Sequence, residues 1–288
     1  MSPLVAWNRA IRQLAPIGHC EGVATGPDGM LWSGDETGRL FRIDPRDGSF
    51  AQVADVGGIA LGLCLDGKGR IYVCIYDRGS IVRVDPASGK VEVYCDRVEG
   101  GQLSSPNWAL FAPDGTLYVS DSCNRGGELD LMPSGRLVSV PPGGGEGEVV
   151  SVSRLAYPNG MALAADGTLF VAESFHDPRV IVVREGEVSV YARLPDTVPD
   201  GLALDEEGGL LVSCFQPNLI LRVPPGGGEP EVVVEDWTGQ RLLTPTNVAF
   251  FGRERRSLAI ASFCGACLYA IDTPWRGQAL FYPSVASA

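Results

Sequence analysis

Side chains that carry carboxylate or amide oxygens recur at long, regular intervals along this 288-residue chain. Glu21, Asn107, Asn159, Asp200 and Asn247 each stand directly before a short run of small or apolar residues. Carboxylate and amide oxygens are hard ligands, which Ca²⁺, Mg²⁺ and Mn²⁺ prefer. If the fold gathers these residues, the chemistry they favour is that of a divalent cation held by oxygen atoms.

An internal repeat provides the elements that would gather them. Six segments share an apolar run, an Asp-Gly-like turn, a second apolar run, a polar loop and a third apolar run. They open at Glu21, Leu61, Asn107, Asn159, Asp200 and Asn247. The openings lie 40 to 52 residues apart, which is the period of a four-stranded propeller blade. We therefore predict an all-β fold, in which residues 1–288 form a single six-bladed β-propeller domain with four-stranded antiparallel blades around a central channel.

The opening residue of each repeat falls at the start of the innermost strand, so the six positions should form a ring around one mouth of the channel. Carboxylates that converge in a narrow space are costly unless a cation offsets their charge. One divalent ion is expected, with Ca²⁺ as first choice and Mg²⁺, Mn²⁺ or Zn²⁺ as alternatives. Asn and Asp also form turns, and each could simply cap the loop before its strand, but five in register favour the metal site.

One end of the chain should supply a strand that completes the last blade, because this removes a free sheet edge. Residues 11–15, just before the first repeat, and residues 279–282, near the end, are both suitably apolar. The sequence leaves both alternatives open.

The motifs at the ring positions resemble those of the family that includes senescence marker protein, gluconolactonase and luciferin-regenerating enzyme. They are His-Cys-Glu-Gly at 19–22, Pro-Asn-Gly-Met-Ala-Leu-Ala-Ala-Asp-Gly at 158–167 and Pro-Asp-Gly-Leu-Ala-Leu-Asp-Glu-Glu-Gly at 199–208. The resemblance implies that Glu21, Asn159 and Asp200 are metal ligands. It also implies that Asp200 is the general base and that Asn107 lies beside the metal and touches substrate or water. The expected activity is metal-dependent hydrolysis of a small lactone or ester.

The third repeat departs from the sugar-lactone members of that family. They usually carry an Arg two residues before the Asn, where this chain has Ser105, so the implied contact to a sugar hydroxyl is missing. The segment 107–121 also looks like strictosidine-synthase-like propellers, which would imply condensing or lyase chemistry. A non-catalytic binding scaffold is the third alternative, because fold alone does not fix function.

The loops between the second and third strands of each repeat should open on the same face as the ring and form a substrate wall. The aromatic residues Trp108, Phe175 and Phe215 would line it, either to bind a substrate less polar than a sugar acid or simply to pack. His176 would serve there as an acid or base, or as an ordinary polar contact.

Two further features lie near the predicted ring. His19, two residues before Glu21, suits a residue that orients a ligand better than a ligand itself. Residues 122–136 form the longest of the wall loops and are a candidate lid.

The composition excludes several kinds of partner. A net charge of −12 would repel nucleic acid, and no apolar run is long enough to span a membrane. Residues 1–15 lack the pattern of a signal peptide, so a cytoplasmic location is expected. The expected partner is a small-molecule substrate, and the oligomeric state is left open. Cys264 and Cys267 have CxxC spacing but no second pair, which favours a turn over a zinc site.

Overall fold

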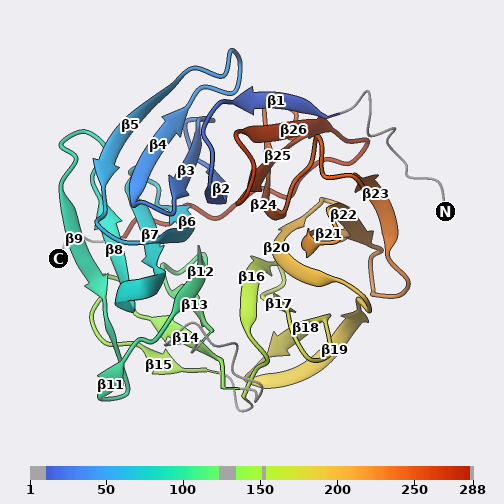
Figure 1. Cartoon of the computed structure of the whole chain (residues 1–288). Helices are drawn as coiled ribbons and strands as arrows, with labels where there is room; N and C mark the ends of the chain where they lie inside the picture. The colour runs from blue at the N-terminus through green and yellow to red at the C-terminus, as the bar shows by residue number, and fades with distance from the viewer. Residues whose placement is uncertain (1–10, 123–133, 151–153, 286–288) are drawn as a thin grey trace.

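The computed structural model describes residues 11–122, 134–150 and 154–285. These residues form six four-stranded antiparallel sheets arranged around a central axis (Figure 1), and this confirms the predicted six-bladed propeller. The only helical element in these ranges is the short 3₁₀ helix η1 (Tyr76–Arg78). No helix in these ranges is long and apolar enough to cross a membrane.

Each blade runs from an inner strand beside the channel to an outer strand at the rim. Blades 1 and 2 contain β2 (Cys20–Thr25), β3 (Leu31–Asp35), β4 (Arg39–Ile43), β5 (Phe50–Asp55), then β6 (Ala60–Leu65), β7 (Ile71–Ile75), β8 (Ser80–Val84) and β9 (Val91–Cys95). Blades 3 and 4 contain β12 (Pro106–Phe111), β13 (Leu117–Asp121), β14 (Arg136–Val140), β15 (Glu148–Val149), then β16 (Pro158–Leu163), β17 (Leu169–Glu173), β18 (Arg179–Arg184) and β19 (Glu187–Arg193). Blades 5 and 6 contain β20 (Val198–Leu204), β21 (Leu210–Gln216), β22 (Leu219–Val223), β23 (Glu231–Glu235), then β24 (Pro245–Phe251), β25 (Ser257–Ser262), β26 (Leu268–Asp272) and β1 (Arg12–Ala15). A two-stranded ribbon, β10 (Arg97–Val98) and β11 (Gly101–Gln102), lies between blades 2 and 3.

The N-terminal strand closes the propeller. β1 pairs antiparallel with β26, so residues 11–15 complete blade 6 and the alternative, residues 279–282, is wrong. The seam between blades 6 and 1 is also joined at the inner strands, because Thr246 Oγ1 donates to the carbonyl of Glu21 at 2.7 Å and Thr25 Oγ1 donates to that of Phe250 at 2.7 Å.

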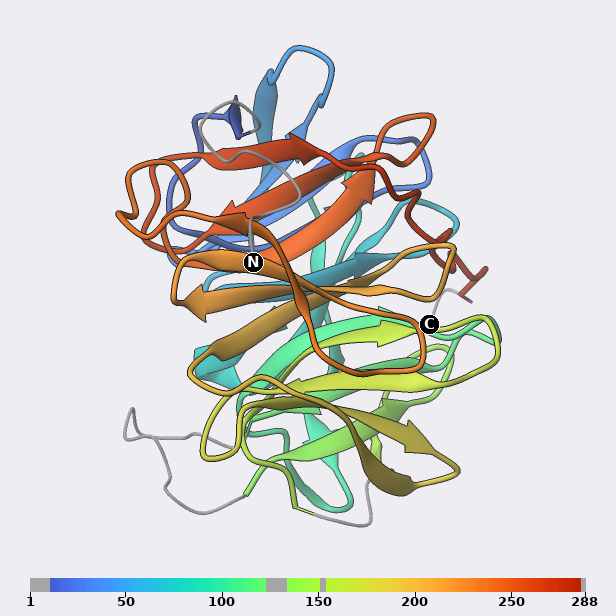
Figure 2. The same cartoon turned by 90° about the vertical axis from the view of Figure 1, so that its right-hand side faces the viewer.

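The C-terminal segment has a different place, across the end of the channel opposite to η1 (Figure 2). Gln278 binds the backbone of blades 4 and 5. Its backbone N–H donates to the carbonyl of Leu204 at 2.9 Å, and its side-chain Nε2 donates to that of Leu163 at 2.8 Å. Tyr282 donates to Thr25 O in blade 1 at 2.8 Å. The segment therefore covers the channel end that the ring does not occupy.

The turn between the first two strands of each blade explains the recurring glycine. Gly29, Gly69, Gly115, Gly167 and Gly208 all have positive φ, between 76° and 91°, where a side chain adds strain. In blade 6 the equivalent residue is Arg255, which adopts φ 48° without being glycine. The sixth repeat thus keeps the turn geometry although it lacks the glycine that marks the turn in the other five repeats.

The Cys264–Cys267 pair lies in the turn between β25 and β26 and is not a disulfide. Cys267 is buried and Cys264 is exposed, as expected for a packed turn. The predicted lid, residues 122–136, falls largely outside the described residues, because 123–133 are not described.

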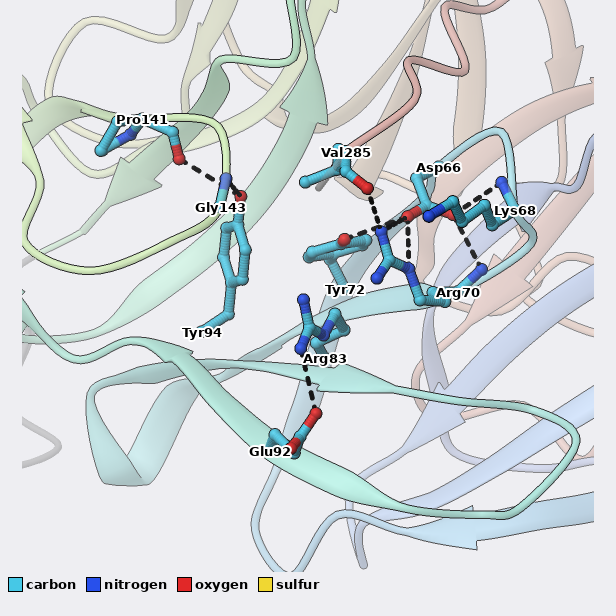
Figure 3. A network of polar contacts seen from close by, with 10 residues as sticks. All are labelled: Asp66, Lys68, Arg70, Tyr72, Arg83, Glu92, Tyr94, Pro141, Gly143 and Val285. Atoms are coloured by element: carbon cyan, nitrogen blue, oxygen red, sulfur yellow. Dashed lines mark hydrogen bonds and ion pairs between the residues drawn. The ribbon is translucent and has the colours of Figure 1, made fainter. Parts of the chain in front are cut away.

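A buried ion pair ties blade 2 to the C-terminal segment (Figure 3). The Arg70 Nε donates to Asp66 Oδ2 at 2.7 Å, and its Nη2 donates to the carbonyl of Val285 at 2.6 Å. Tyr72 donates to the same Asp66 oxygen at 3.1 Å. Because Asp66 is fully buried, its charge depends on these partners.

We expect Arg70→Met to destabilise the protein by about 3 kcal/mol, because it leaves a buried carboxylate without its cation. The free energy of unfolding in urea measures the loss. Arg46→Met is the matched control, since Arg46 pairs with Asp44 at an exposed site and should change stability by less than about 0.5 kcal/mol. Equal effects of the two substitutions would contradict a special role for the buried pair.

Candidate functional site

The strand pairing places five of the predicted ring residues at the same position of their blades. Pro106, for example, pairs with Asp121 and Pro158 with Glu173, and the next residue in each inner strand is the ring residue. The same register gives these five ring positions: Glu21, Leu61, Asn107, Asn159 and Asp200. All five are buried, so they gather around one channel mouth as predicted.

The sixth ring position is Thr246, not Asn247 as predicted. Pro245 pairs with Ser262, which makes Thr246 the residue equivalent to Asn107. Asn247 lies one step further along, where its side chain packs against Gly201 of blade 5 and its Oδ1 accepts from the amide of Val248. The error arises because β24 has seven residues where β12 has six, so counting back from the turn reaches Asn247 instead of Thr246.

Glycines let the inner strands approach closely enough to form the ring. A Cβ on Gly22 would lie 2.4 Å from the carbonyl oxygen of Leu61, and one on Gly160 would lie 2.4 Å from that of Asp200. Neither position can accept a side chain without moving a neighbouring backbone. The Glu-Gly, Asn-Gly and Asp-Gly pairs of the sequence therefore encode the close packing that brings the ring residues together.

Two carboxylates converge in this ring without a cation beside them. Glu21 is 7% exposed and Asp200 is 5% exposed. Burial raises the pKa of Glu21 to about 8. The pKa of Asp200 is also well above its usual range, first because of burial and then because of the nearby Glu21 charge, although a hydrogen bond from Asn159 opposes the shift.

Three buried oxygens of the ring have no hydrogen-bond partner: Glu21 Oε2, Asn107 Oδ1 and Asp200 Oδ1. Asn159 uses its amide nitrogen to donate to Ser174 Oγ at 3.2 Å, which is compatible with its oxygen facing the ring. An unsatisfied buried oxygen is costly, and a cation satisfies several at once.

This donor set fits a hard divalent cation. Ca²⁺ takes six to eight oxygens, so the two carboxylates and two amides would leave positions for water or substrate. Within the described ranges no three His, Cys, Asp or Glu residues cluster as a metal site.

The predicted wall residues take different places. Trp108 is 7% exposed and belongs to the apolar core with Met161, so it chiefly packs. Phe175 and Phe215 are half-buried in the loops that follow β17 and at the end of β21. His176 is exposed, with φ 68°.

His19 lies close to the ring in sequence but faces the exposed Glu36. Its Nδ1 is 3.4 Å from Glu36 Oε1, and the side chain is 58% exposed. The structure thus shows a surface contact for His19 and no contact with a ring side chain.

Two tyrosines complete the mouth, and one of them was missed by sequence reasoning. Tyr157, two residues before Asn159, meets Tyr76 of η1 with 3.2 Å between their hydroxyl oxygens. The Tyr157 ring also packs edge-to-face on Phe175, with centroids 5.0 Å apart. Burial, Tyr76 and the Asp200 and Glu21 carboxylates raise the pKa of Tyr157 far above its usual range. Its place just before the Pro-Asn-Gly motif was the available signal.

Three arginines near the mouth are paired with buried carboxylates. Arg39, Arg136 and Arg179 each bind a buried carboxylate at the end of the second strand of their own blade. These partners are Asp35 at 2.7 Å, Asp121 at 3.0 Å and Glu173 at 2.5 Å. The repeated pair holds the loops of blades 1, 3 and 4 in place.

An apolar cavity of about 460 Å³ occupies the other end of the channel. The ends of the inner strands line it, and residues 278–282 cover it. It includes no carboxylate and no ring residue, so the chemistry described above belongs to the opposite mouth.

Curated relatives of this chain include two lactonases and a plant propeller protein. The gluconolactonase of Zymomonas mobilis subsp. mobilis is 26% identical over 183 residues, covering 53% of this chain and 48% of that protein. The 6-deoxy-6-sulfogluconolactonase of Pseudomonas putida is 27% identical over 274 residues, covering 88% and 85%. Protein STRICTOSIDINE SYNTHASE-LIKE 8 of Arabidopsis thaliana is 26% identical, covering 73% and 58%. The chain thus spans only about half the length of the first and third of these relatives.

Solved structures support the same fold. A gluconolactonase from Xanthomonas campestris superposes with a TM-score of 0.76 at 24% identity, covering 92% of this chain and 89% of that one. Residues 19–263 match the region described as SMP-30/Gluconolactonase/LRE-like. Since this match includes the ring and nearly all blades, the chain belongs to the SMP-30/gluconolactonase/LRE-like family.

Proposed function

We propose that this protein is a divalent-metal-dependent hydrolase of a small lactone or ester, with Ca²⁺ as the first candidate cation. The observation that carries the proposal is the pair of buried carboxylates, Glu21 and Asp200, each of which has an unpartnered oxygen, as does the amide of Asn107. Family membership and the two lactonase relatives point to the same type of reaction.

Glu21, Asn159 and Asp200 would hold the cation, and Asn107 would face the substrate or a water beside it. A bound cation would supply a polarised acyl oxygen and a water of lowered pKa. Asp200 accepts the proton of the attacking water through its free Oδ1. The water oxygen joins the acyl carbon, the acyl C–O bond breaks, and the proton passes to the leaving oxygen, so a lactone gives one hydroxy acid.

The surroundings of the ring favour a compact, uncharged substrate. Arg39, Arg136 and Arg179 are committed to buried carboxylates, while Tyr76, Tyr157 and Phe175 give an aromatic side. These surroundings differ from those of a site that binds many sugar hydroxyls. The same conclusion follows from Ser105, which stands where the sugar-lactone members of the family usually carry an Arg.

Condensing or lyase chemistry is the second candidate, and the match to the strictosidine synthase-like protein favours it. It would use the carboxylates as acid and base without a cation, whereas two facing carboxylates with free oxygens are better matched by a metal. A binding scaffold has less support, because the exposed large apolar residues are scattered: Phe50, Val93, Val190, Trp237 and Leu280.

Metal dependence tests the proposal directly. We expect metal-stripped protein to hydrolyse neither a lactone panel nor aryl esters, and to regain turnover with one of Ca²⁺, Mg²⁺, Mn²⁺ or Zn²⁺. Ca²⁺ at about 100 times its Kd should add about 2.7 kcal/mol of stability. Asp200→Asn should abolish both the turnover and the Ca²⁺-dependent rise in Tm.

The matched control is Asp272→Asn, which removes an exposed carboxylate far from the ring. It should keep wild-type turnover and metal response. Turnover by the wild-type protein that persists after chelation would contradict the metal mechanism and favour the second candidate.

The raised pKa of Glu21 predicts an unusual pH dependence of the metal-free protein. The folded state holds a proton on Glu21 up to about pH 8, whereas the unfolded chain releases it near pH 4.5. Since the folded state binds more protons in this window, stability should fall as pH rises from about 4.5 to about 8. Thermal melts between pH 5 and 8.5 measure this slope.

Ca²⁺ should suppress the slope, because metal ligands must be deprotonated and binding releases protons. Calorimetry at pH 7 in two buffers of different ionisation enthalpy counts the protons released. Glu21→Gln should flatten the metal-free slope, whereas His19→Asn should leave it unchanged. A metal-free Tm that rises steadily over this range would refute the convergence of buried carboxylates.

A further inference from the structure

Tyr76 and Tyr157 form a contact that the blade framework alone does not require. Tyr76 belongs to η1 of blade 2 and Tyr157 leads into β16 of blade 4, so the pair joins two blades that are not neighbours. Their hydroxyl oxygens are 3.2 Å apart, on the channel side of blade 3, which carries Asn107. The pair therefore lies over the mouth of the proposed site.

The backbone of Tyr157 is held in a conformation that costs energy. Its φ is 56°, in the left-handed region where non-glycine residues are strained by about 1–3 kcal/mol. The Tyr157 carbonyl accepts the amide of Ser174 at 3.3 Å, and the ring rests against Phe175. The backbone bond recurs in blades 1 and 6, where His19 and Thr244 have φ 57° and 43° at the same place, whereas the contact with Phe175 holds the ring of Tyr157 itself.

One hydroxyl hydrogen of the pair is left for a third group. Two phenols have two hydrogens, and only one is used between their oxygens. Either hydroxyl of the pair can be the donor, and when Tyr76 donates to the Tyr157 oxygen, the Tyr157 hydrogen is left to point toward the ring. A hydroxyl that accepts a hydrogen bond is a stronger donor, because such chains polarise cooperatively.

We propose that the Tyr157 hydroxyl donates to the acyl oxygen of the substrate as that oxygen gains negative charge, and that Tyr76 positions and polarises Tyr157. This inference rests on the proposed hydrolase function and adds a donor to it. No covalent bond to Tyr157 forms and no proton is transferred from it. The preferred substrate is thus one whose acyl oxygen reaches both the ring and Tyr157, as in a small lactone or an aryl ester.

Conservative phenylalanine substitutions test the donor while they keep the aromatic side. With Ca²⁺-loaded protein, Tyr157→Phe should lower kcat by roughly 10²-fold on the best lactone or aryl ester, the scale for loss of one such donor. KM should change by less than about threefold, because the contact strengthens in the transition state. Tyr76→Phe should lower kcat roughly fivefold, since Tyr157 then keeps its hydrogen but loses its polarising partner.

The double variant separates this role from a merely structural one. Because Tyr76 acts through Tyr157, the double variant should match Tyr157→Phe instead of showing the product of the two losses. Tyr94→Phe is the control, since its hydroxyl is hydrogen-bonded to the backbone of 141 and 143 (Figure 3). Ca²⁺ affinity and Tm should stay at wild-type values in all of the single variants at the mouth.

The possible failures are distinguishable. Wild-type protein without metal-dependent turnover overturns the proposed function, and with it this inference. Active wild-type protein with a Tyr157→Phe kcat within threefold of the Tyr94→Phe kcat overturns the inference alone. A loss in Tyr157→Phe that appears only as weaker Ca²⁺ binding would make Tyr157 a support of the metal site, which also contradicts a donor to substrate.

Discussion

The close approach of six inner strands around a narrow channel is the constraint on which the site depends. At Gly22 and Gly160 the neighbouring backbone leaves no room for a Cβ, so the strand starts are drawn together. Glu21 and Asp200 then lie near enough to repel each other, and burial adds to the cost. A propeller that merely needed to fold could place small apolar residues there, as blade 2 does with Leu61. The proposed cation site rests on these two retained carboxyl groups.

Hydroxyl groups fix the inner strands without using the ring oxygens. Ser33 donates to the carbonyl of Gly22 at 2.6 Å, Ser213 donates to that of Thr246 at 2.8 Å, and Thr246 donates to that of Glu21 at 2.7 Å. These bonds satisfy backbone carbonyls next to the ring, so its side-chain oxygens are left for other partners. The same division appears further out, where buried carboxylates take up the arginines of their own blades. The polar groups that stabilise the blades are thus different from the ring oxygens that are proposed to bind the cation.

The sequence predicted the blades and most of the ring because both follow from a regular period. Glu21, Asn159 and Asp200 are found at equivalent strand positions, and the Asn-Gly or Asp-Gly pairs that identified them are also what allows the strands to meet. Asn247 was misplaced by one residue because β24 is one residue longer than β12, so counting back from the turn at Arg255 stops one residue short of the ring position. Tyr157 was missed because its contact with Tyr76 spans 81 residues and two non-adjacent blades, and no local sequence pattern predicts such a contact.

The choice between 11–15 and 279–282 as the closing strand depended on pairing across the whole chain, which local apolarity cannot decide.

The ring is asymmetric, so the proposed cation and the substrate would occupy different sides of the mouth. Its carboxylates come from blades 1 and 5, which flank Thr246 of blade 6, while blade 3 on the opposite side presents Asn107. A cation drawn to the carboxylates would lie away from blade 3, so the space over that blade remains for the substrate. Tyr76 and Tyr157 meet over that same side, because they come from blades 2 and 4. A substrate bound there would have the proposed cation on one side and a phenol donor on the other, which are the two groups that the hydrolysis of a neutral ester requires beside its acyl oxygen.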